Sequence, residues 1–199
     1  VLKYFPRLLE ATRRLLVERA ECVQAQEAAL VAVTSLAEVV GDAFRPYYGA
    51  LVPTLKNIIE RAKDERFRLL RGKALEAFTF IGLAAAKEQF LPDANDVMRD
   101  MAATPVSSDD PQASYIEAAW ARLAECFGPD FAKFLPVVMP LTLERAKKQA
   151  ELRYFAPGEK QAGWDVNYAG SAGIGIHTAA LEDKASAIHI LACYAAQIG

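Results

Sequence analysis

Hydrophobic positions recur at steps of three and four residues over most of this chain. In residues 28–40, for example, the apolar positions are Ala29, Val33, Leu36, Val39 and Val40. This spacing gathers apolar side chains into one stripe along a helix. No segment shows sustained alternation of apolar and polar positions bounded by turn residues. The pattern therefore predicts an all-helical chain without strands.

A first marker repeats at a nearly constant interval. An aromatic or apolar pair lies close to a proline four times: Tyr4-Phe5-Pro6, Pro46-Tyr47-Tyr48, Phe90-Leu91-Pro92 and Phe134-Leu135-Pro136. Phe5, Tyr48, Leu91 and Leu135 are separated by 43, 43 and 44 residues. A fixed period in this range is the signature of a repeat protein.

A second marker gives the same period. An acid is followed five residues later by a large apolar residue and four residues after that by alanine. The copies are Glu65, Leu70 and Ala74; Asp110, Tyr115 and Ala119; and Asp183, Ile188 and Ala192, with a degenerate first copy ending at Ala32. The alanines at 32, 74 and 119 are 42 and 45 residues apart, and Ala192 lies 73 further on. The last repeat therefore contains about 30 extra residues.

Two helices per repeat and this period predict an α-α superhelix, a solenoid of about four HEAT-type helix pairs over residues 1–199. We expect first (A) helices at 4–19, 47–63, 92–103 and 134–150, and second (B) helices at 23–41, 66–87, 111–127 and 181–198. Asp109-Asp110-Pro111 predicts the start of the third B helix, with Asp110 as N-cap and Pro111 at the first helical position. Both ends are expected to continue into further repeats.

Residues 151–180 are predicted to be an irregular insertion within the last pair. They contain Pro157 and several glycines and lack helical periodicity. Long loops of this kind are either functional or tolerated surface insertions. We expect partial order around Trp164, Tyr168 and Ile176.

Composition limits the function classes. With 53% hydrophobic and 24% charged residues the chain is globular, and its net charge of −2 disfavours nucleic acid as a direct partner. No apolar run approaches a membrane span, so membrane insertion is not expected. The cysteines Cys22, Cys126 and Cys193 lie far apart in helical stretches, which is the usage of a reducing compartment.

Few residues suggest catalysis, a metal or a cofactor. The two histidines, His177 and His189, accompany no paired cysteines, so no metal site is predicted. His189 and Cys193 share one helix face, but packing explains this cysteine better than nucleophilic catalysis. Gly170–Gly175 resembles a phosphate loop but lacks its strand and its Lys-Ser/Thr ending, so we interpret it as a flexible linker.

A basic run crosses the second A-to-B turn. It consists of Arg61, Lys63, Arg66, Arg68, Arg71 and Lys73. An anion-binding patch is one interpretation; a solvated turn, interleaved with Asp64 and Glu65, is the better one. Arg71 is expected to pair with acids of the neighbouring repeat, which is a structural role.

The candidate binding residues lie on the B helices, one layer of which lines the concave face of a curved solenoid. They are Glu27, Glu76, Glu117, Trp120 and Glu125. Carboxylates with an interspersed aromatic suit a basic extended peptide through ion pairs and cation–π contact. Two alternatives remain: Trp120 could belong to the inter-repeat core, and the glutamates could be ordinary solvated positions.

Several segments, taken together and in order, resemble importin-beta superfamily receptors, and among them the karyopherin beta-three or importin-five type. They are Leu69–Lys73, Ile81–Ala84, Lys87–Phe90, Asp96–Met98, Asp109–Gln112, Ser114–Tyr115, Ala119–Arg122, Phe134–Met139, Gly163–Trp164 and Leu181–Lys184. The resemblance runs with interruptions from about residue 30 to 195. Receptors of this family carry a more acidic segment near the insertion, whereas 151–180 contains only Glu151, Glu159 and Asp165 as acids.

This resemblance implies part of a nuclear transport receptor that shuttles between cytoplasm and nucleus. Such receptors bind cargo with basic nuclear localisation signals on the B-helix face and release it when Ran-GTP binds. They also bind phenylalanine-glycine nucleoporins, whose phenylalanines insert between A helices. The alternative within the same fold is a HEAT-repeat scaffold of a phosphatase or chromosome-associated complex. An enzyme is not expected, because no titratable residues converge.

Overall fold

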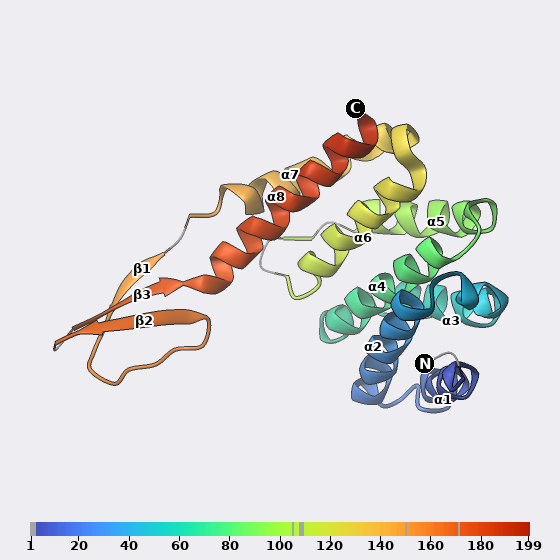
Figure 1. Cartoon of the computed structure of the whole chain (residues 1–199), viewed down its shortest axis with the longest axis horizontal. Coiled ribbons are helices and arrows are strands. Elements are labelled where there is room, and N and C mark those ends of the chain that lie inside the picture. The colour runs from blue at the N-terminus through green and yellow to red at the C-terminus, as the bar shows by residue number, and fades with distance from the viewer. Residues whose placement is uncertain (1–2, 105, 108–109, 150, 171) are drawn as a thin grey trace.

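The computed structural model contains four antiparallel helix pairs and one small β-sheet (Figure 1). It describes residues 3–104, 106–107, 110–149, 151–170 and 172–199. The A helices are α1 (Phe5–Glu18), α3 (Tyr48–Arg61), α5 (Lys87–Ala102) and α7 (Leu135–Lys147). The B helices are α2 (Val23–Val40), α4 (Arg68–Ala84), α6 (Ala113–Phe127) and α8 (Thr178–Ile198). The predicted all-helical solenoid of about four HEAT-type pairs is thus confirmed as the fold class.

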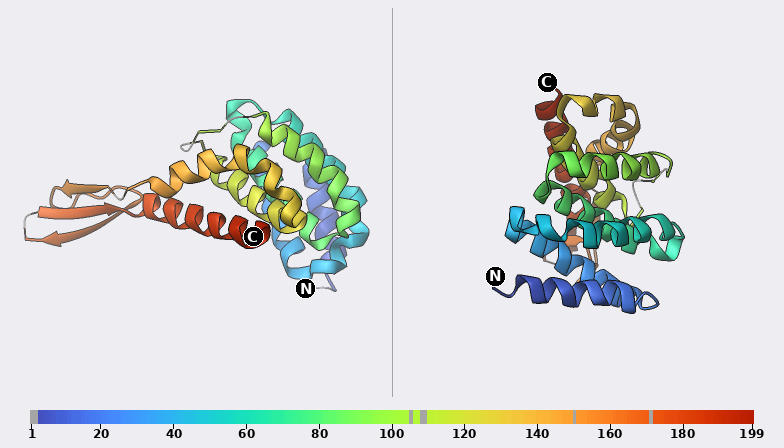
Figure 2. Two further views of the ribbon diagram at one scale, coloured as in Figure 1. Left: turned by 90° about the horizontal axis from the view of Figure 1, so that it is seen from above. Right: turned by 90° about the vertical axis from the view of Figure 1, so that its right-hand side faces the viewer.

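The pairs stack in chain order, with the B helices packed in the series α2, α4, α6 and α8 (Figure 2). The core is one continuous cluster that runs through this stack. Several residues of the two repeat markers are core positions, whereas Ile188 and Ala192 of the last copy are exposed. Ala74 and Ala119 are fully buried where neighbouring B helices meet, and Phe5 and Tyr48 are almost fully buried at the starts of their A helices. The small side chains of Ala74 and Ala119 let neighbouring B helices approach closely.

Two of the B-to-A connections have the same construction. Gly41 and Gly128 end α2 and α6 with φ of +51° and +57°, a conformation that glycine adopts without strain. Short 3-10 helices follow, η1 (Gly41–Tyr47) and η3 (Gly128–Phe134). Each 3-10 helix buries one phenylalanine, Phe44 or Phe131. The connection between α4 and α5 is only two residues long. Helix α4 ends earlier than predicted, and helix α5 begins earlier than predicted.

Several predicted helix boundaries are therefore corrected. The third A helix starts at Lys87 rather than 92, with Pro92 inside the helix, and α4 ends at Ala84 rather than 87. The third B helix starts at Ala113 rather than 111, so the prediction of Asp110 as N-cap and Pro111 as first helical residue is wrong. The Asp110 carboxylate accepts from the Gln112 N–H (3.0 Å) in a turn before the helix. Asp109 lies outside the described residues. The fourth B helix starts at Thr178 rather than 181.

The insertion contains a sheet, so the prediction that the chain has no strands is wrong. The strands are β1 (Leu152–Phe155), β2 (Trp164–Ala169) and β3 (Ala172–His177), antiparallel in the order β1-β3-β2. They project as an arm from the ends of α7 and α8 (Figure 1). The interpretation of Gly170–Gly175 as a flexible linker is also wrong, because most of it is strand β3.

One face of the arm has its own small core. Phe155 and Trp164 pack edge to face over Gly175 (ring centroids 5.4 Å apart), and His177 stacks on Trp164 (5.0 Å). A side chain at Gly175 would overlap the Phe155 ring. The expected ordering role of Trp164 is confirmed. Ile176, by contrast, lies on the opposite, exposed face of the sheet.

Candidate protein-interaction surfaces

The exposed side of the B helices carries a mixed but mainly acidic stripe, the B-helix stripe. It contains Glu27 of α2, Lys73 and Glu76 of α4, and Arg122 and Glu125 of α6. Lys73 Nζ lies 2.8 Å from a Glu27 carboxylate oxygen, so the charge of Glu27 is already compensated. Glu125 is exposed. Glu27 is therefore the weakest anchor for an incoming cation.

Arg122 lies at the centre of this stripe. Its Nε donates to the Thr79 hydroxyl (2.7 Å), and its guanidinium stacks over the Phe80 ring (4.5 Å to the centroid). Its Nη2 is buried without a hydrogen-bond partner. Burial lowers the pKa of Arg122, opposed by the charges of Glu76, Glu125 and Glu38.

Glu76 is the half-buried acid of the stripe. Burial raises its pKa, while the charge of Arg122 acts in the opposite direction. A carboxylate held partly out of water gains more than a solvated one from an incoming cation. Glu76 thus fits the predicted role better than Glu27.

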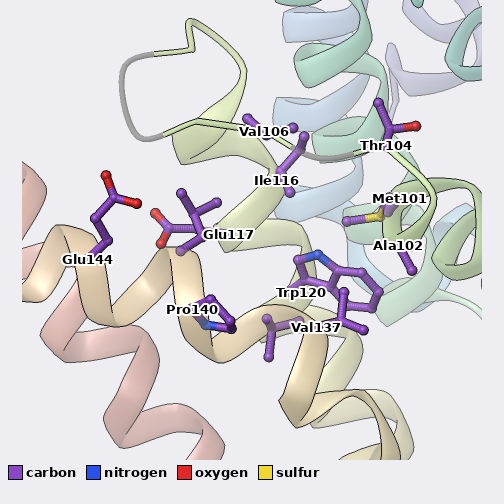
Figure 3. Close-up of a pocket in the computed structure, with 12 residues that line it drawn as sticks. Met101, Ala102, Thr104, Val106, Ile116, Glu117, Trp120, Val137, Pro140 and Glu144 are labelled. Atoms are coloured by element: carbon purple, nitrogen blue, oxygen red, sulfur yellow. The ribbon is translucent and has the colours of Figure 1, made fainter.

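Two predicted stripe residues lie elsewhere. Glu117 and Trp120 are on α6, but their side chains are buried against α7 and η3 (Figure 3). The Trp120 ring packs on Phe131 and Phe134, with ring centroids 5.9 and 5.7 Å apart. This packing supports the alternative that Trp120 belongs to the core. The prediction that both residues lie on an exposed polar face is wrong, because the fourth helix pair covers that side of α6.

The basic run at the second A-to-B turn is tied up in internal contacts. The partners are Gln26 for Arg61, Asp100 for Lys63 and Arg71, Asp64 for Arg66, Asp110 for Arg68 and Glu27 for Lys73. The side chain of Arg71 is fully buried and reaches Asp100 (2.9 Å) and Gln112 (3.0 Å) of the next repeat. The predicted structural role of Arg71 is confirmed. These pairings leave little free positive charge for an anion.

Three grooves separate successive A helices, and they differ in chemistry. The first, between α1 and α3, is a cavity of about 390 Å³. Its walls are mostly apolar or neutral and include Leu16, Val17, Pro53 and Ile58. Its one cation, Arg61, donates to Gln26. This groove suits an uncharged apolar side chain.

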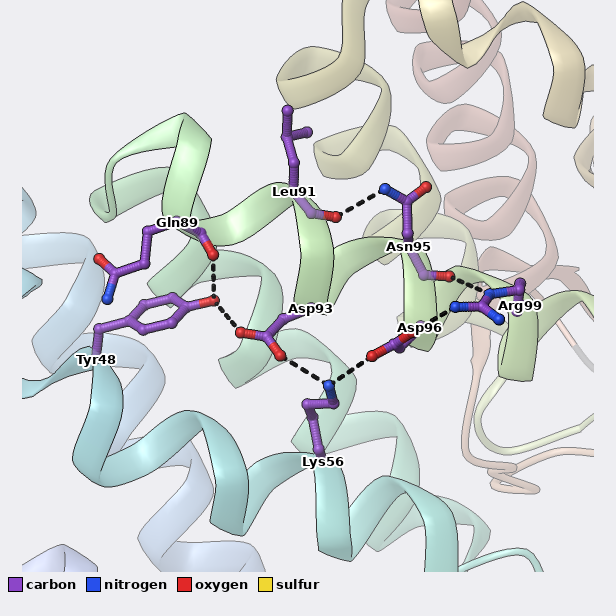
Figure 4. A network of polar contacts seen from close by, with 8 residues as sticks. All are labelled: Tyr48, Lys56, Gln89, Leu91, Asp93, Asn95, Asp96 and Arg99. Carbon is purple, nitrogen blue, oxygen red and sulfur yellow. Dashed lines mark hydrogen bonds and ion pairs between the residues drawn. The ribbon is translucent and has the colours of Figure 1, made fainter.

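The second groove, between α3 and α5, is bridged by polar contacts (Figure 4). The Tyr48 hydroxyl donates to Asp93 (2.8 Å), and Lys56 Nζ contacts both Asp93 (2.7 Å) and Asp96 (3.0 Å). Burial and the bond to Asp93 raise the pKa of Tyr48. This ladder ties the two helices together. Beside it the groove opens into a cavity of about 290 Å³, whose walls include Lys56, Glu60 and Asp100.

The third groove, the α5–α7 pocket, is a cavity of about 340 Å³ floored by α6 (Figure 3). Met101, Ile116, Trp120 and Val137 are among its apolar walls. Its two charged lining residues are Glu117 and Glu144. Neither lysine nor arginine is among its described lining residues, whereas Arg61 lines the first groove and Lys56 the second.

A buried ionic cluster lies at the edge of this pocket. The Arg145 guanidinium of α7 contacts Glu117 of α6 and Asp183 of α8. The Glu117 Oε1 atom is buried without a hydrogen-bond partner. The Thr142 hydroxyl donates to the Val138 carbonyl (3.0 Å) and also lies near enough to Glu117 to lower the pKa of its carboxyl. Burial raises the pKa of Glu117, while Arg145 acts in the opposite direction.

Other chemistry finds little support in the described part of the chain. No group of three or more His, Cys, Asp or Glu side chains is arranged there to hold a metal ion. None of the helices described has the length and apolarity to cross a membrane. Cys193 Sγ lies 3.7 Å from His189 Nε2, and the partly buried Cys193 packs against the core, as the packing interpretation expects.

Comparison with known proteins identifies the family. The chain is 31% identical over 192 residues to "Importin subunit beta-3" of Saccharomyces cerevisiae, an alignment that covers 92% of this chain and 18% of that protein. It is 31% identical over 111 residues to "Probable importin-5 homolog" of Dictyostelium discoideum, covering 55% and 10%. No protein-family model matches the sequence.

Solved structures agree with the sequence relatives. The fold is similar to that of Kap121p bound to Pho4p, with a TM-score of 0.83, 31% identity and coverage of 98% of this chain and 19% of that one. Kap121p bound to Nup53p gives a TM-score of 0.79 with the same identity and coverage. The chain thus spans less than a fifth of the length of these relatives. It belongs to the importin-beta (karyopherin-beta) family, near the karyopherin beta-three and importin-five type.

Proposed function

We propose that this chain is a segment of a nuclear import receptor, a non-enzymatic scaffold that binds basic cargo and nucleoporins while shuttling between cytoplasm and nucleus. The observation that carries the proposal is the similarity to Kap121p, whose structures include complexes with Pho4p, Ste12p, Cdc14p, Ulp1p and Nup53p. Release of cargo by Ran-GTP would be a property of the whole receptor.

The B-helix stripe is the proposed cargo surface. Glu76 and Glu125 offer carboxylates to lysine or arginine side chains of an extended peptide. Phe80 contributes little to a cationic ligand, because the Arg122 guanidinium already stacks on its ring. Glu27 contributes less, since Lys73 already neutralises it. Glu117 and Trp120 are not part of this proposed surface.

The α1–α3 groove is the proposed nucleoporin site. Its apolar walls could bury a phenylalanine ring without desolvating an unpaired charge, because Arg61 keeps its bond to Gln26. A Phe side chain buried in this way would contribute about 1.5–3 kcal/mol. Thr54 and Asn57 at the rim can bond to the backbone of the repeat.

The cargo proposal is tested with the full-length receptor and a fluorescent lysine-rich localisation-signal peptide. We expect the triple change Glu27→Lys, Glu76→Lys and Glu125→Lys to weaken binding at least tenfold, each lost charged contact contributing about 1 kcal/mol or more. The control reverses three exposed acids away from the stripe, Glu18, Glu65 and Glu88. Equal affinity of both triple variants would refute the cargo surface.

A second measurement addresses the transport cycle. Pull-down of the same peptide with and without Ran-GTP should show release in the presence of Ran-GTP. Copurification with a phosphatase catalytic subunit or chromosome proteins, together with no binding to nucleoporins, would favour the alternative scaffold function.

A further inference from the structure

The α5–α7 pocket has no part in the proposed function. Its walls bring together an indole, aliphatic side chains and two carboxylates (Figure 3). Neither lysine nor arginine occurs among its described lining residues. We propose that this pocket binds one long cationic side chain, lysine or arginine, of a partner protein.

The first argument is the unpartnered atom. Glu117 is 1% exposed, and its Oε1 has no hydrogen-bond partner, although its other oxygen binds Arg145. Buried carboxylate oxygens in native proteins are rarely left without a donor. The charge of Glu117 is already balanced by Arg145, and an ammonium or guanidinium group supplies the donor that Oε1 lacks.

The second argument is the charge at the entrance. Glu144 of α7 is exposed and lies on the same side of the pocket as the Glu117 carboxylate (Figure 3). Arg145 and Lys148 face the cluster from α7, but Asp183 of α8 contacts both of them. With Glu117, Glu144 and Asp183 against these two cations, the local balance favours an incoming positive charge.

The third argument is the shape of the ligand. Lysine and arginine carry three or four methylenes between the backbone and the charge, and such stems pack well on apolar surfaces. Ile116, Val137 and the Trp120 ring line the path of that stem. The indole face also attracts a cation directly. A short polar side chain would not combine these contacts.

The site lies on the A-helix side and is therefore separate from the B-helix stripe. The proposal is tested with Nα-acetyl-lysine methylamide as probe, together with its uncharged norleucine analogue and its arginine analogue. Methyl NMR of the full chain reports binding through Met101, with Met98 and Met139 as internal references. Either the lysine or the arginine probe should shift the Met101 methyl resonance. We expect the tighter-binding of the two to have about tenfold higher affinity than the norleucine analogue.

Variants locate the effect. Glu144→Gln should weaken the cationic probe two- to threefold and leave norleucine unchanged, whereas Glu88→Gln, at the other end of α5, should change neither. Glu117→Gln should remove the preference for the cation. This change also disturbs Arg145, so if the Glu117→Gln protein does not fold, the result for Glu144→Gln is the deciding one. The B-helix triple variant should bind the probe normally, which separates this site from the cargo surface.

A preference for lysine or for arginine identifies the side chain and supports the site. Equal shifts with norleucine, or no shift of Met101 with any probe, would overturn the proposal.

Discussion

Glu117 of α6 forms an ion pair with Arg145 of α7, and both side chains are almost inaccessible to water. Arg145 also contacts Asp183 of α8. One guanidinium therefore ties the third helix pair to both helices of the fourth, at the base of the β-sheet arm. Charges held this far from water are costly unless each keeps its partner.

Removing one partner should destabilise the chain strongly. We expect Arg145→Met to cost about 3–5 kcal/mol, because Glu117 stays buried without compensation. The double change Glu117→Leu and Arg145→Met should recover much of this loss, since it removes both buried charges. Urea unfolding followed by circular dichroism measures the difference. A matched change in an exposed pair, Arg13→Met beside Glu10, should have little effect.

The role of Glu117 illustrates what the sequence could not show. Its polar character on α6 suggested an exposed stripe, yet burial depends on which neighbouring helix covers that side. Arg145 was the available signal. An arginine among the apolar residues of the fourth A helix suggests an acidic partner on a neighbouring helix. Residue type at a single helix position does not distinguish the two environments.

The repeat pattern was more informative, because it depends on many positions at once. Phe5 and Tyr48 each begin an A helix with a buried aromatic ring. Their counterparts Leu91 and Leu135 are partly buried and pack against the same core. Their spacing therefore gave the period and the number of helix pairs. The early start of α5 was missed because Pro92 suggested a helix start, whereas it lies inside the helix.

The sheet was missed because its central strand alternates glycine with isoleucine. Gly173 and Gly175 lie on the aromatic face, where only glycine leaves room for the rings, and Ile174 and Ile176 lie on the exposed face. Glycine ordinarily weakens a strand, so the alternation was interpreted as a flexible segment. The period of two was nevertheless present in the sequence.

The arm therefore gives a second prediction. Gly175→Ala should push the Phe155 and Trp164 rings away and loosen the sheet without unfolding the helices. Limited trypsin digestion, read by mass spectrometry, should show faster cleavage after Arg153 and Lys160 while the helical circular dichroism is unchanged. Ile174→Ala, on the exposed face of the same strand, is the control and should digest at nearly the wild-type rate. Simultaneous loss of helix signal would show that the arm is not a separate unit.

A third prediction concerns glycine in helices. A side chain at Gly82 of α4 would overlap the Phe90 ring, which packs on Phe78 (centroids 5.2 Å apart) between the second and third pairs. We expect Gly82→Ala to cost about 1–3 kcal/mol through overpacking. Gly49→Ala, in α3 with open space around it, should stabilise by about 0.5–1 kcal/mol. Thermal unfolding of both variants should move the midpoint in opposite directions.

A last prediction follows from the half-buried Glu76 of the B-helix stripe. Burial raises its pKa above the ordinary 4.5, with Arg122 opposing the shift. The folded chain then binds more protons than the unfolded chain between pH 4.5 and the raised value, so this group lowers stability as pH rises through that window. Glu76→Gln removes the titrating group and should be more stable relative to wild type at pH 7 than at pH 4.

Urea unfolding at both pH values measures this difference. Glu125→Gln is the matched control, because it makes the same substitution at an exposed acid of the same stripe. If Glu76→Gln instead lost stability relative to wild type between pH 4 and pH 7, the attraction between Glu76 and Arg122 would outweigh the cost of burying the carboxylate. Glu76 would then be a fixed partner of Arg122 and a poor anchor for cargo. The sign of this one pH effect therefore decides whether the stripe keeps a carboxylate available for a basic peptide.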